Sequence, residues 1–162
     1  MKAFQPATVF PAILVLAACG GTSIQSVFSP TQRAAVDDFL REHPKAELVQ
    51  TSDCTNPDLD KFVSENPNYR PYYAEGDFTG DGSFDFVIAT KSAGAYDLWL
   101  FPGAGADYKA PQNFATLTLL HEGGFIVRGR NLYVGTLYGD TGNFYSWEAA
   151  INRFAIISND QP

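Results

Sequence analysis

Residues 73–90 read YAEGDFTGDGSFDFVIAT, and this stretch decides the fold. A loop rich in aspartate and glycine separates two apolar segments, and the continuous apolar run Phe86–Ala89 follows it. An Asp-Gly pair between two such segments is a strong signal for a β-hairpin. The stretch therefore predicts two antiparallel strands, Tyr72–Asp77 and Phe84–Thr90, joined by a loop.

The loop carries an oxygen-bearing side chain at every second position. Counting from Asp77 as position 1, the residues at positions 1, 3, 5, 7 and 9 are Asp77, Thr79, Asp81, Ser83 and Asp85, and Gly82 is at position 6. This is the front of an EF-hand-type calcium loop, in which a short chain wraps an ion that takes about six to eight oxygens. We expect the three aspartates to donate carboxylate oxygens, Thr79 its hydroxyl and Ser83 its backbone carbonyl. A bare hairpin turn without metal is the alternative.

The loop departs from an EF-hand at position 12, where Ile88 stands in place of the bidentate Glu and the chain continues as a strand. This combination resembles the calcium loops of FG-GAP and VCBS repeats, written D-x-N-G-D-G-x-x-D. The matching residues are Asp77, Gly80, Asp81, Gly82 and Asp85, with Thr79 in place of Asn. The resemblance implies one structural calcium ion, and the missing Glu favours weak binding, with a Kd of about 10⁻⁴–10⁻³ M. Since the loop occurs once, the resemblance does not extend to a propeller or to adhesion.

Short strands with a period of two fill the rest of the chain. Besides the two above, the pattern predicts the strands Tyr96–Phe101, Ala115–His121, Phe125–Arg128, Leu132–Tyr138, Phe144–Ala149 and Phe154–Ser158. Gly-containing turns separate most of them, and such short connections require antiparallel hairpins. The longest irregular stretch is expected at Gly103–Asn113.

Two helices are predicted before these strands. Ser29-Pro30-Thr31-Gln32 combines a capping box with Pro at the first helical position, so a helix should begin there and end near His43. A second helix should begin at Asn56-Pro57 and stop before Pro67. The short segment Ala46–Thr51 between them suits a strand. The expected fold is α+β, with two N-terminal helices packed on an antiparallel, meander-like sheet of about six to eight strands, in one domain over residues 29–162.

The first 18 residues have the composition of a targeting segment. Lys2 is the one charge before Arg33, and residues 7–18 are nearly all apolar. That run is shorter than the roughly 20 residues a membrane-spanning helix needs. A positive start, a short apolar core and small residues before the cut are typical of a secretory signal peptide.

Leu16-Ala17-Ala18-Cys19 resembles the bacterial lipoprotein box. The resemblance implies cleavage before Cys19, diacylation of its thiol and acylation of its amine by fatty acids such as palmitate. Gly rather than Asp at position 20 implies sorting to the outer membrane of proteobacteria, with residues 19–28 as a lipidated tether. An ordinary secretory signal, with Cys19 incidental, is the alternative.

Charge narrows the possible partners. The formal charge is −7 and becomes −8 when Lys2 leaves with the signal peptide. No basic patch is present for phosphate, so nucleic acid is not expected as a partner. The second cysteine, Cys54, has no internal disulfide partner once Cys19 is lipidated. We expect it to be a small buried residue, with an intermolecular disulfide as the alternative.

No catalytic motif stands out, because the two histidines, His43 and His121, lie far apart and no G-x-S-x-G elbow occurs. The sequence therefore predicts a non-catalytic envelope lipoprotein with a structural calcium ion, held on the membrane through Cys19. The alternative is an acidic binding module for a cationic protein such as a lysozyme, because charge steers such association. The order of helix, strand-turn-strand and late aromatic hairpin is also similar to that of small bacterial envelope proteins, which implies no activity.

Overall fold

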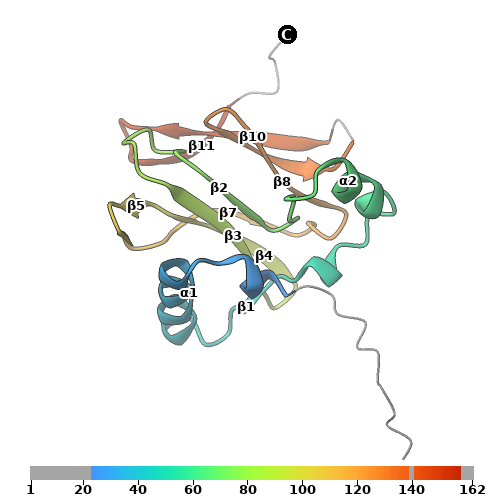
Figure 1. Cartoon of the computed structure of the whole chain (residues 1–162), viewed down its shortest axis with the longest axis horizontal. Helices are drawn as coiled ribbons and strands as arrows, with labels where there is room; N and C mark the ends of the chain where they lie inside the picture. Colours follow the sequence, from blue (N-terminus) through green and yellow to red (C-terminus); the bar gives the residue numbers. More distant parts are fainter. Residues whose placement is uncertain (1–22, 139–140, 158–162) are drawn as a thin grey trace, which may run out of the picture.

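The computed structural model describes residues 23–138 and 141–157. Two antiparallel sheets pack face to face in this part of the chain, and α1 lies against the other face of the first sheet (Figure 1). Strands account for 42% and helices for 20% of the structure. The predicted α+β fold, with two helices on one sheet, is therefore wrong, and the protein is mostly β.

The first sheet has five strands centred on β3. Its order is β1-β3-β4-β7, and β2 also pairs with β3. The strands are β1 (Glu47–Leu48), β2 (Tyr73–Gly76), β3 (Asp85–Ser92), β4 (Ala95–Phe101) and β7 (Gln112–Leu117). Residues 85–90 are all buried, so both faces of β3 are covered. This explains why the run Phe86–Ala89 is apolar throughout rather than alternating.

The second sheet supplies the cover for one of these faces. Its order is β11-β10-β9-β8, formed by β8 (Gly123–Arg128), β9 (Asn131–Thr136), β10 (Gly142–Glu148) and β11 (Arg153–Ile157). The ring of Phe114 on β7 contacts the rings of Tyr145 and Phe154 on this sheet. At the opposite edge, the N–H of Phe125 donates to the carbonyl of Pro71 (2.7 Å). The two sheets therefore meet at both edges and enclose one core.

The helices contribute unequally to that core. α1 (Pro30–Glu42) begins with the predicted capping box, and its Phe39 packs against Trp99 and Phe101 on β4. α2 (Leu59–Glu65) buries no residue, so it cannot cover a sheet. Two short 3-10 helices, η1 (Ile24–Val27) and η2 (Thr51–Asp53), complete the helical elements of the described chain. None of the helices described is long and apolar enough to cross a membrane.

Four predicted boundaries need correction. The second helix begins at Leu59 rather than at Asn56-Pro57, and the strand expected over Ala46–Thr51 is reduced to β1, Glu47–Leu48. The predicted strand Ala115–His121 ends as β7 at Leu117, because the chain there leaves the first sheet and crosses through residues 118–122 to β8. The stretch expected to be irregular, Gly103–Asn113, holds the small hairpin of β5 (Gly103–Ala104) and β6 (Asp107–Tyr108) and the start of β7.

The hydrophobic core lies wholly within residues 24–154 of the described chain. A chain that begins at position 19 therefore keeps every side chain of this core. The predicted signal peptide, residues 1–18, and the predicted lipidation site Cys19 lie outside the described residues.

Candidate functional site

The loop between β2 and β3 contains four of the five predicted ligand residues, Asp77, Thr79, Asp81 and Ser83, and the fifth, Asp85, is the first residue of β3. The loop folds around its first carboxylate. Oδ1 of Asp77 accepts the N–H of Gly80 (2.7 Å), and Oδ2 accepts the N–H of Gly82 (3.3 Å). Both glycines have positive φ, +73° and +84°, a region that other residues rarely adopt. The sequence Gly-Asp-Gly therefore lets this loop turn sharply around Asp77.

Asp85 anchors the end of the loop inside the protein. Its side chain is fully buried, and Oδ2 accepts the N–H of Thr79 (2.8 Å). Its other oxygen, Oδ1, accepts the N–H of Gly103 on β5 (2.8 Å). The carboxylate thus fastens the loop to the small β5–β6 hairpin. A side chain at position 103 would clash with the backbone of Phe84, so glycine is required for this close approach.

Asp81 lies at the exposed tip of the loop. Its Oδ1 accepts the N–H of Ser83 (2.9 Å), and its Oδ2 pairs with Nζ of Lys109 (3.2 Å). The Ser83 hydrogen bond, together with the Lys109 ammonium, holds the pKa of the Asp81 carboxyl below its usual value. Asp81 is therefore ionised and already has a cationic partner.

A second cation borders the loop from the turn between β8 and β9. Nε of Arg130 donates to the carbonyl of Asp77 (3.3 Å), and its guanidinium occupies the space that a side chain at Gly80 would need. Neither Lys109 nor Arg130 was predicted to lie at this loop. They lie 28 residues after Asp81 and 53 residues after Asp77, and no local pattern marks them.

The donor set of the loop suits calcium, because it consists entirely of hard oxygens. In the structure these carboxylates accept backbone N–H groups and the Lys109 ammonium. Over residues 23–138 and 141–157, no group of three or more His, Cys, Asp or Glu side chains is arranged to hold a metal ion. The loop therefore matches a calcium site in the type and the sequence spacing of its oxygen donors, and not in their present arrangement.

Cys54 is half-buried rather than fully buried. Its Sγ lies 3.8 Å from the carbonyl of Gly123. Burial, and secondarily the nearby thiol, raises the pKa of both Tyr69 and Tyr72 above the usual range. The backbone of His121 is hydrogen-bonded to Thr55, the residue after Cys54: the carbonyl of His121 accepts the N–H of Thr55 (2.7 Å).

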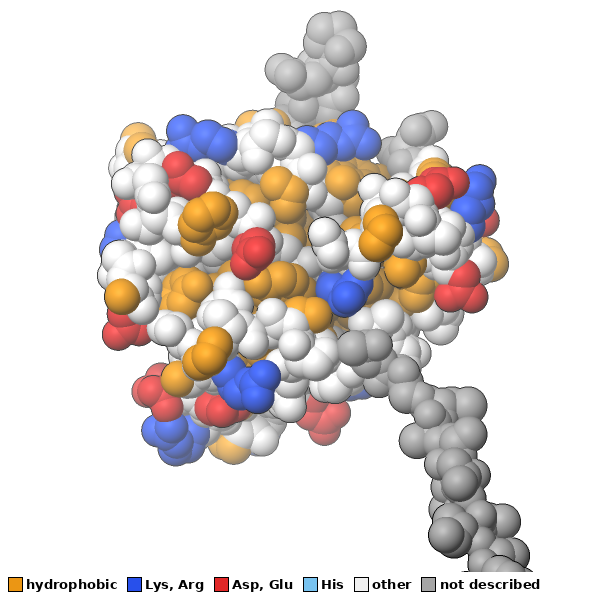
Figure 2. Space-filling view, viewed as in Figure 1, with side chains coloured by type: hydrophobic (Ala, Val, Ile, Leu, Met, Phe, Trp, Pro, Cys, Tyr) orange, Lys and Arg blue, Asp and Glu red, His pale blue; other side chains and the backbone are white. Residues whose placement is uncertain are grey.

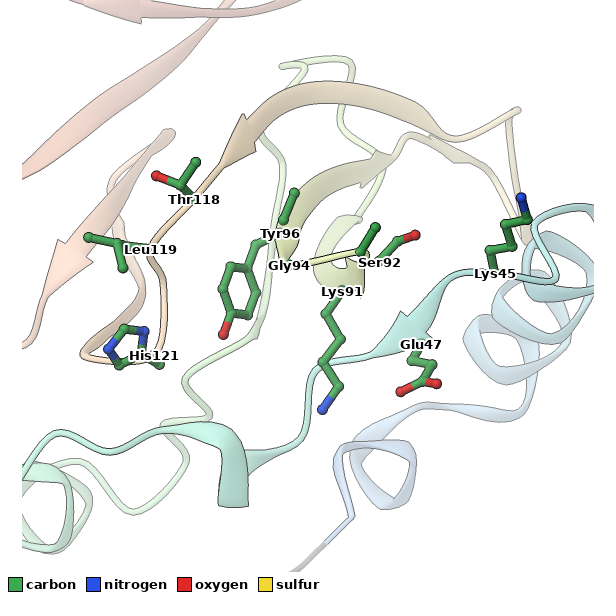
Figure 3. Close-up of a pocket in the computed structure, with 11 residues that line it drawn as sticks. Lys45, Glu47, Lys91, Ser92, Gly94, Tyr96, Thr118, Leu119 and His121 are labelled. Carbon is green, nitrogen blue, oxygen red and sulfur yellow. The ribbon is translucent and has the colours of Figure 1, made fainter.

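Two adjoining cavities lie at the end of the sandwich where the chain crosses between the sheets. The first has a volume of about 420 Å³ and is shown in Figure 3. Two cations, Lys45 and Lys91, line it, but Glu47 lines it too and both carboxylate oxygens of Asp53 bind Nζ of Lys91 (2.9 Å each). The charges in this cavity therefore balance, and it does not select an anion.

The second cavity has a volume of about 690 Å³ and is named here the inter-sheet pocket. It shares Leu119 and His121 with the first cavity, and Figure 3 shows both residues on the segment after β7. The inter-sheet pocket is further lined by residues of β9 and β10, namely Val134, Gly135, Thr136, Gly142 and Asn143. This pocket was not predictable from the sequence, because it exists only where the two sheets meet.

Comparison of the chain with protein-family models, curated proteins and solved structures found no match. On the face seen in Figure 2, acidic and basic side chains are interspersed around a hydrophobic centre, so this face carries no patch of a single charge.

Proposed function

We propose that this protein is a non-catalytic lipoprotein of the bacterial cell envelope, in which calcium bound by the loop Asp77–Asp85 has a structural role. The observation that carries the proposal is the loop itself. Its oxygen donors alternate along the chain, and it folds around Asp77 and ends on the buried Asp85. A calcium ion would be held by the carboxylates of Asp77, Asp81 and Asp85, the hydroxyl of Thr79 and the carbonyl of Ser83.

Two features of the loop explain why an ion would stabilise the fold. Three carboxylates within nine residues repel one another, and a divalent cation would offset that repulsion. Asp85 also reaches β5 through Gly103, so tightening the loop would brace the edge of the core. The Lys109 ammonium competes for Asp81, which favours the weak end of the calcium range.

The test is thermal unfolding of residues 19–162 carrying Cys19→Ser, first in EDTA and then with calcium. For a Kd near 10⁻⁴ M, calcium at about 10 mM is 100 times Kd and adds about 2.7 kcal/mol. At this chain length each kcal/mol shifts the Tm by about 2–4 °C. We therefore expect a rise of roughly 5–11 °C.

Asp81→Ala should abolish the rise, because Asp81 is an exposed carboxylate of the loop whose loss leaves the core intact. The matched control is Asp38→Ala on α1, since Asp38 is also an exposed aspartate paired with one cation, Arg41. The control should keep the full shift. A shift of equal size in both variants would mean that calcium acts elsewhere, and no shift in the parent chain would leave the loop as a bare hairpin turn.

Membrane attachment is tested separately in a Gram-negative host that expresses the full chain. We expect incorporation of labelled palmitate and recovery with the outer membrane. The Cys19→Ala variant should carry no label, and it should be recovered in the soluble fraction or as the uncleaved precursor. Palmitate label retained by Cys19→Ala would refute the lipidation site.

One observation favours the alternative function, binding of a cationic protein. Phe84 is 71% exposed and is held on the braced loop between Ser83 and the buried Asp85. Aromatic side chains, including Phe, are enriched at protein interfaces, and a side chain held in place before binding loses less conformational freedom. Lysozyme binding that weakens with salt and is lost in Phe84→Ala would support this function. Absence of binding at low salt would exclude lysozyme.

A further inference from the structure

The inter-sheet pocket has the size and position of a ligand site. Its volume of about 690 Å³ lies within the usual range of roughly 300–1,000 Å³ for small-molecule pockets. One wall comes from β7 and the crossing segment, through Leu117, Leu119 and Leu120. The other comes from the ends of β9 and β10, including Val134. The pocket thus opens between the two sheets, at the point where they separate.

The lining of this pocket is mixed. Its aliphatic part consists of three leucines and Val134, and five polar or charged residues, His121, Glu122, Thr136, Thr141 and Asn143, line the rest. The chain contains 23 Phe, Tyr and Trp residues, yet none of them lines the inter-sheet pocket. Three glycines, Gly123, Gly135 and Gly142, expose backbone there instead. A Cβ at Gly135 would clash with the carbonyl of Thr141 and the hydroxyl of Tyr133, so close packing between β9 and β10 requires glycine at this point. The leucine and valine side chains, with no aromatic side chain of Phe, Tyr or Trp beside them, suit a flexible aliphatic chain rather than a stacked ring.

The charged side chains at the pocket limit which head group the ligand can carry. Glu122 is the carboxylate among the lining residues, and its Oε1 lies 3.9 Å from Nε2 of His121. The chain as a whole is strongly acidic. An anionic head group would therefore be repelled, whereas Thr136 and Asn143 offer neutral hydrogen-bonding groups.

We propose that the inter-sheet pocket binds one acyl chain of an uncharged or zwitterionic lipid. Leu119 marks the entrance, because it lines the pocket and is nevertheless 71% exposed. An acyl chain in the pocket would cover this side chain. The envelope location proposed above supplies the lipid, and the binding site itself depends only on the fold.

The experiment is isothermal titration of residues 19–162 carrying Cys19→Ser, with lauroyl-lysophosphatidylcholine kept below its micelle concentration. EDTA is present throughout, so neither calcium nor the protein's own lipid enters the measurement. We expect saturable binding of one lipid per chain. Phosphocholine, the head group alone, should not bind, and laurate, which is anionic, should bind about tenfold more weakly or worse.

Leu119→Asp should raise the Kd about tenfold or more, because it places a second carboxylate beside Glu122 at the entrance. The matched control is Ile151→Asp. Ile151 is 50% exposed and lies in the turn between β10 and β11, at the opposite end of β10 from Asn143. The Kd of the Ile151→Asp variant for the lysolipid should equal that of the parent chain, and both variants should have the Tm of the parent chain.

Equal Kd values for the two variants, or binding seen only above the micelle concentration, would overturn the pocket assignment. Binding of laurate as tight as that of the lysolipid would overturn the choice of an uncharged or zwitterionic head group. Failure of the calcium shift or of palmitate labelling would leave these outcomes unchanged, since the titration uses neither the Asp77–Asp85 loop nor Cys19.

Discussion

Replacing Asp85 with alanine should be among the most destabilising changes to a single polar side chain. The carboxylate is fully buried, and its two oxygens accept the N–H groups of Thr79 and Gly103, each at 2.8 Å. Without it, two backbone donors lose their acceptor. An unsatisfied buried donor costs about 1–3 kcal/mol, so the expected loss of unfolding free energy is about 2–6 kcal/mol. That is a large part of the roughly 5–15 kcal/mol typical of a native domain.

Urea unfolding in EDTA, followed by tryptophan fluorescence, measures this loss without any contribution from calcium. Asp77→Ala is the matched control, because Asp77 also accepts two backbone N–H groups, from Gly80 and Gly82, but its bonds are exposed. Water can replace that acceptor, so the cost should be about 0.5–2 kcal/mol, as for a helix cap. An Asp85→Ala loss below about 1 kcal/mol, or one no larger than that of Asp77→Ala, would refute the reasoning.

Three further predictions concern the loop and the strand ends. The folded protein holds the pKa of Asp81 below its ordinary value of 3.8, so Asp81 stabilises the fold at neutral pH. This contribution is lost as the pH falls through the folded pKa. In thermal melts between pH 3 and 7, the Tm of Asp81→Asn should therefore fall less with acid than that of the parent chain. Lys109→Gln should lower the calcium Kd in a calorimetric titration, since it frees Asp81, and an unchanged Kd would mean that this ion pair does not compete. In urea unfolding, Gly135→Ala should lose more stability than Gly82→Ala. The Cβ at position 135 is forced into neighbouring backbone, which costs about 1–3 kcal/mol or more. The Cβ at position 82 meets open space, so that variant costs only about 1 kcal/mol of backbone strain.

The two proposed sites occupy different parts of the molecule and serve different purposes. The Asp77–Asp85 loop joins β2 to β3 and fastens to β5. The inter-sheet pocket lies where β7 leads into β8 and β9 turns toward β10. A calcium ion would act on stability, whereas an acyl chain would act on recognition. Separate variants, Asp81→Ala and Leu119→Asp, therefore test them independently.

Local sequence patterns located the elements well. The capping box at Ser29 and Gln32 set the start of α1, because both of its hydrogen bonds lie within one turn. The Asp-Gly loop placed the β2–β3 hairpin for the same reason. The assignment of Asp77, Thr79, Asp81, Ser83 and Asp85 as calcium ligands stays a prediction. Their individual roles were not predictable, since burial separates Asp85 from Asp81 and only the packed structure shows it.

By itself, the sequence determined the antiparallel hairpins, the first helix and the alternating oxygen donors of the loop, because each depends on neighbours a few residues apart. The tertiary structure alone decided that the chain leaves one sheet after Leu117 and builds a second. A period of two shows which side chains share a face of a strand but not which sheet will cover that face. The run Phe86–Ala89 is buried on both faces of β3, and the second sheet, rather than α2, supplies the cover on one of them. The inter-sheet pocket, Lys109 beside Asp81 and Arg130 beside Asp77 all follow from that long-range packing.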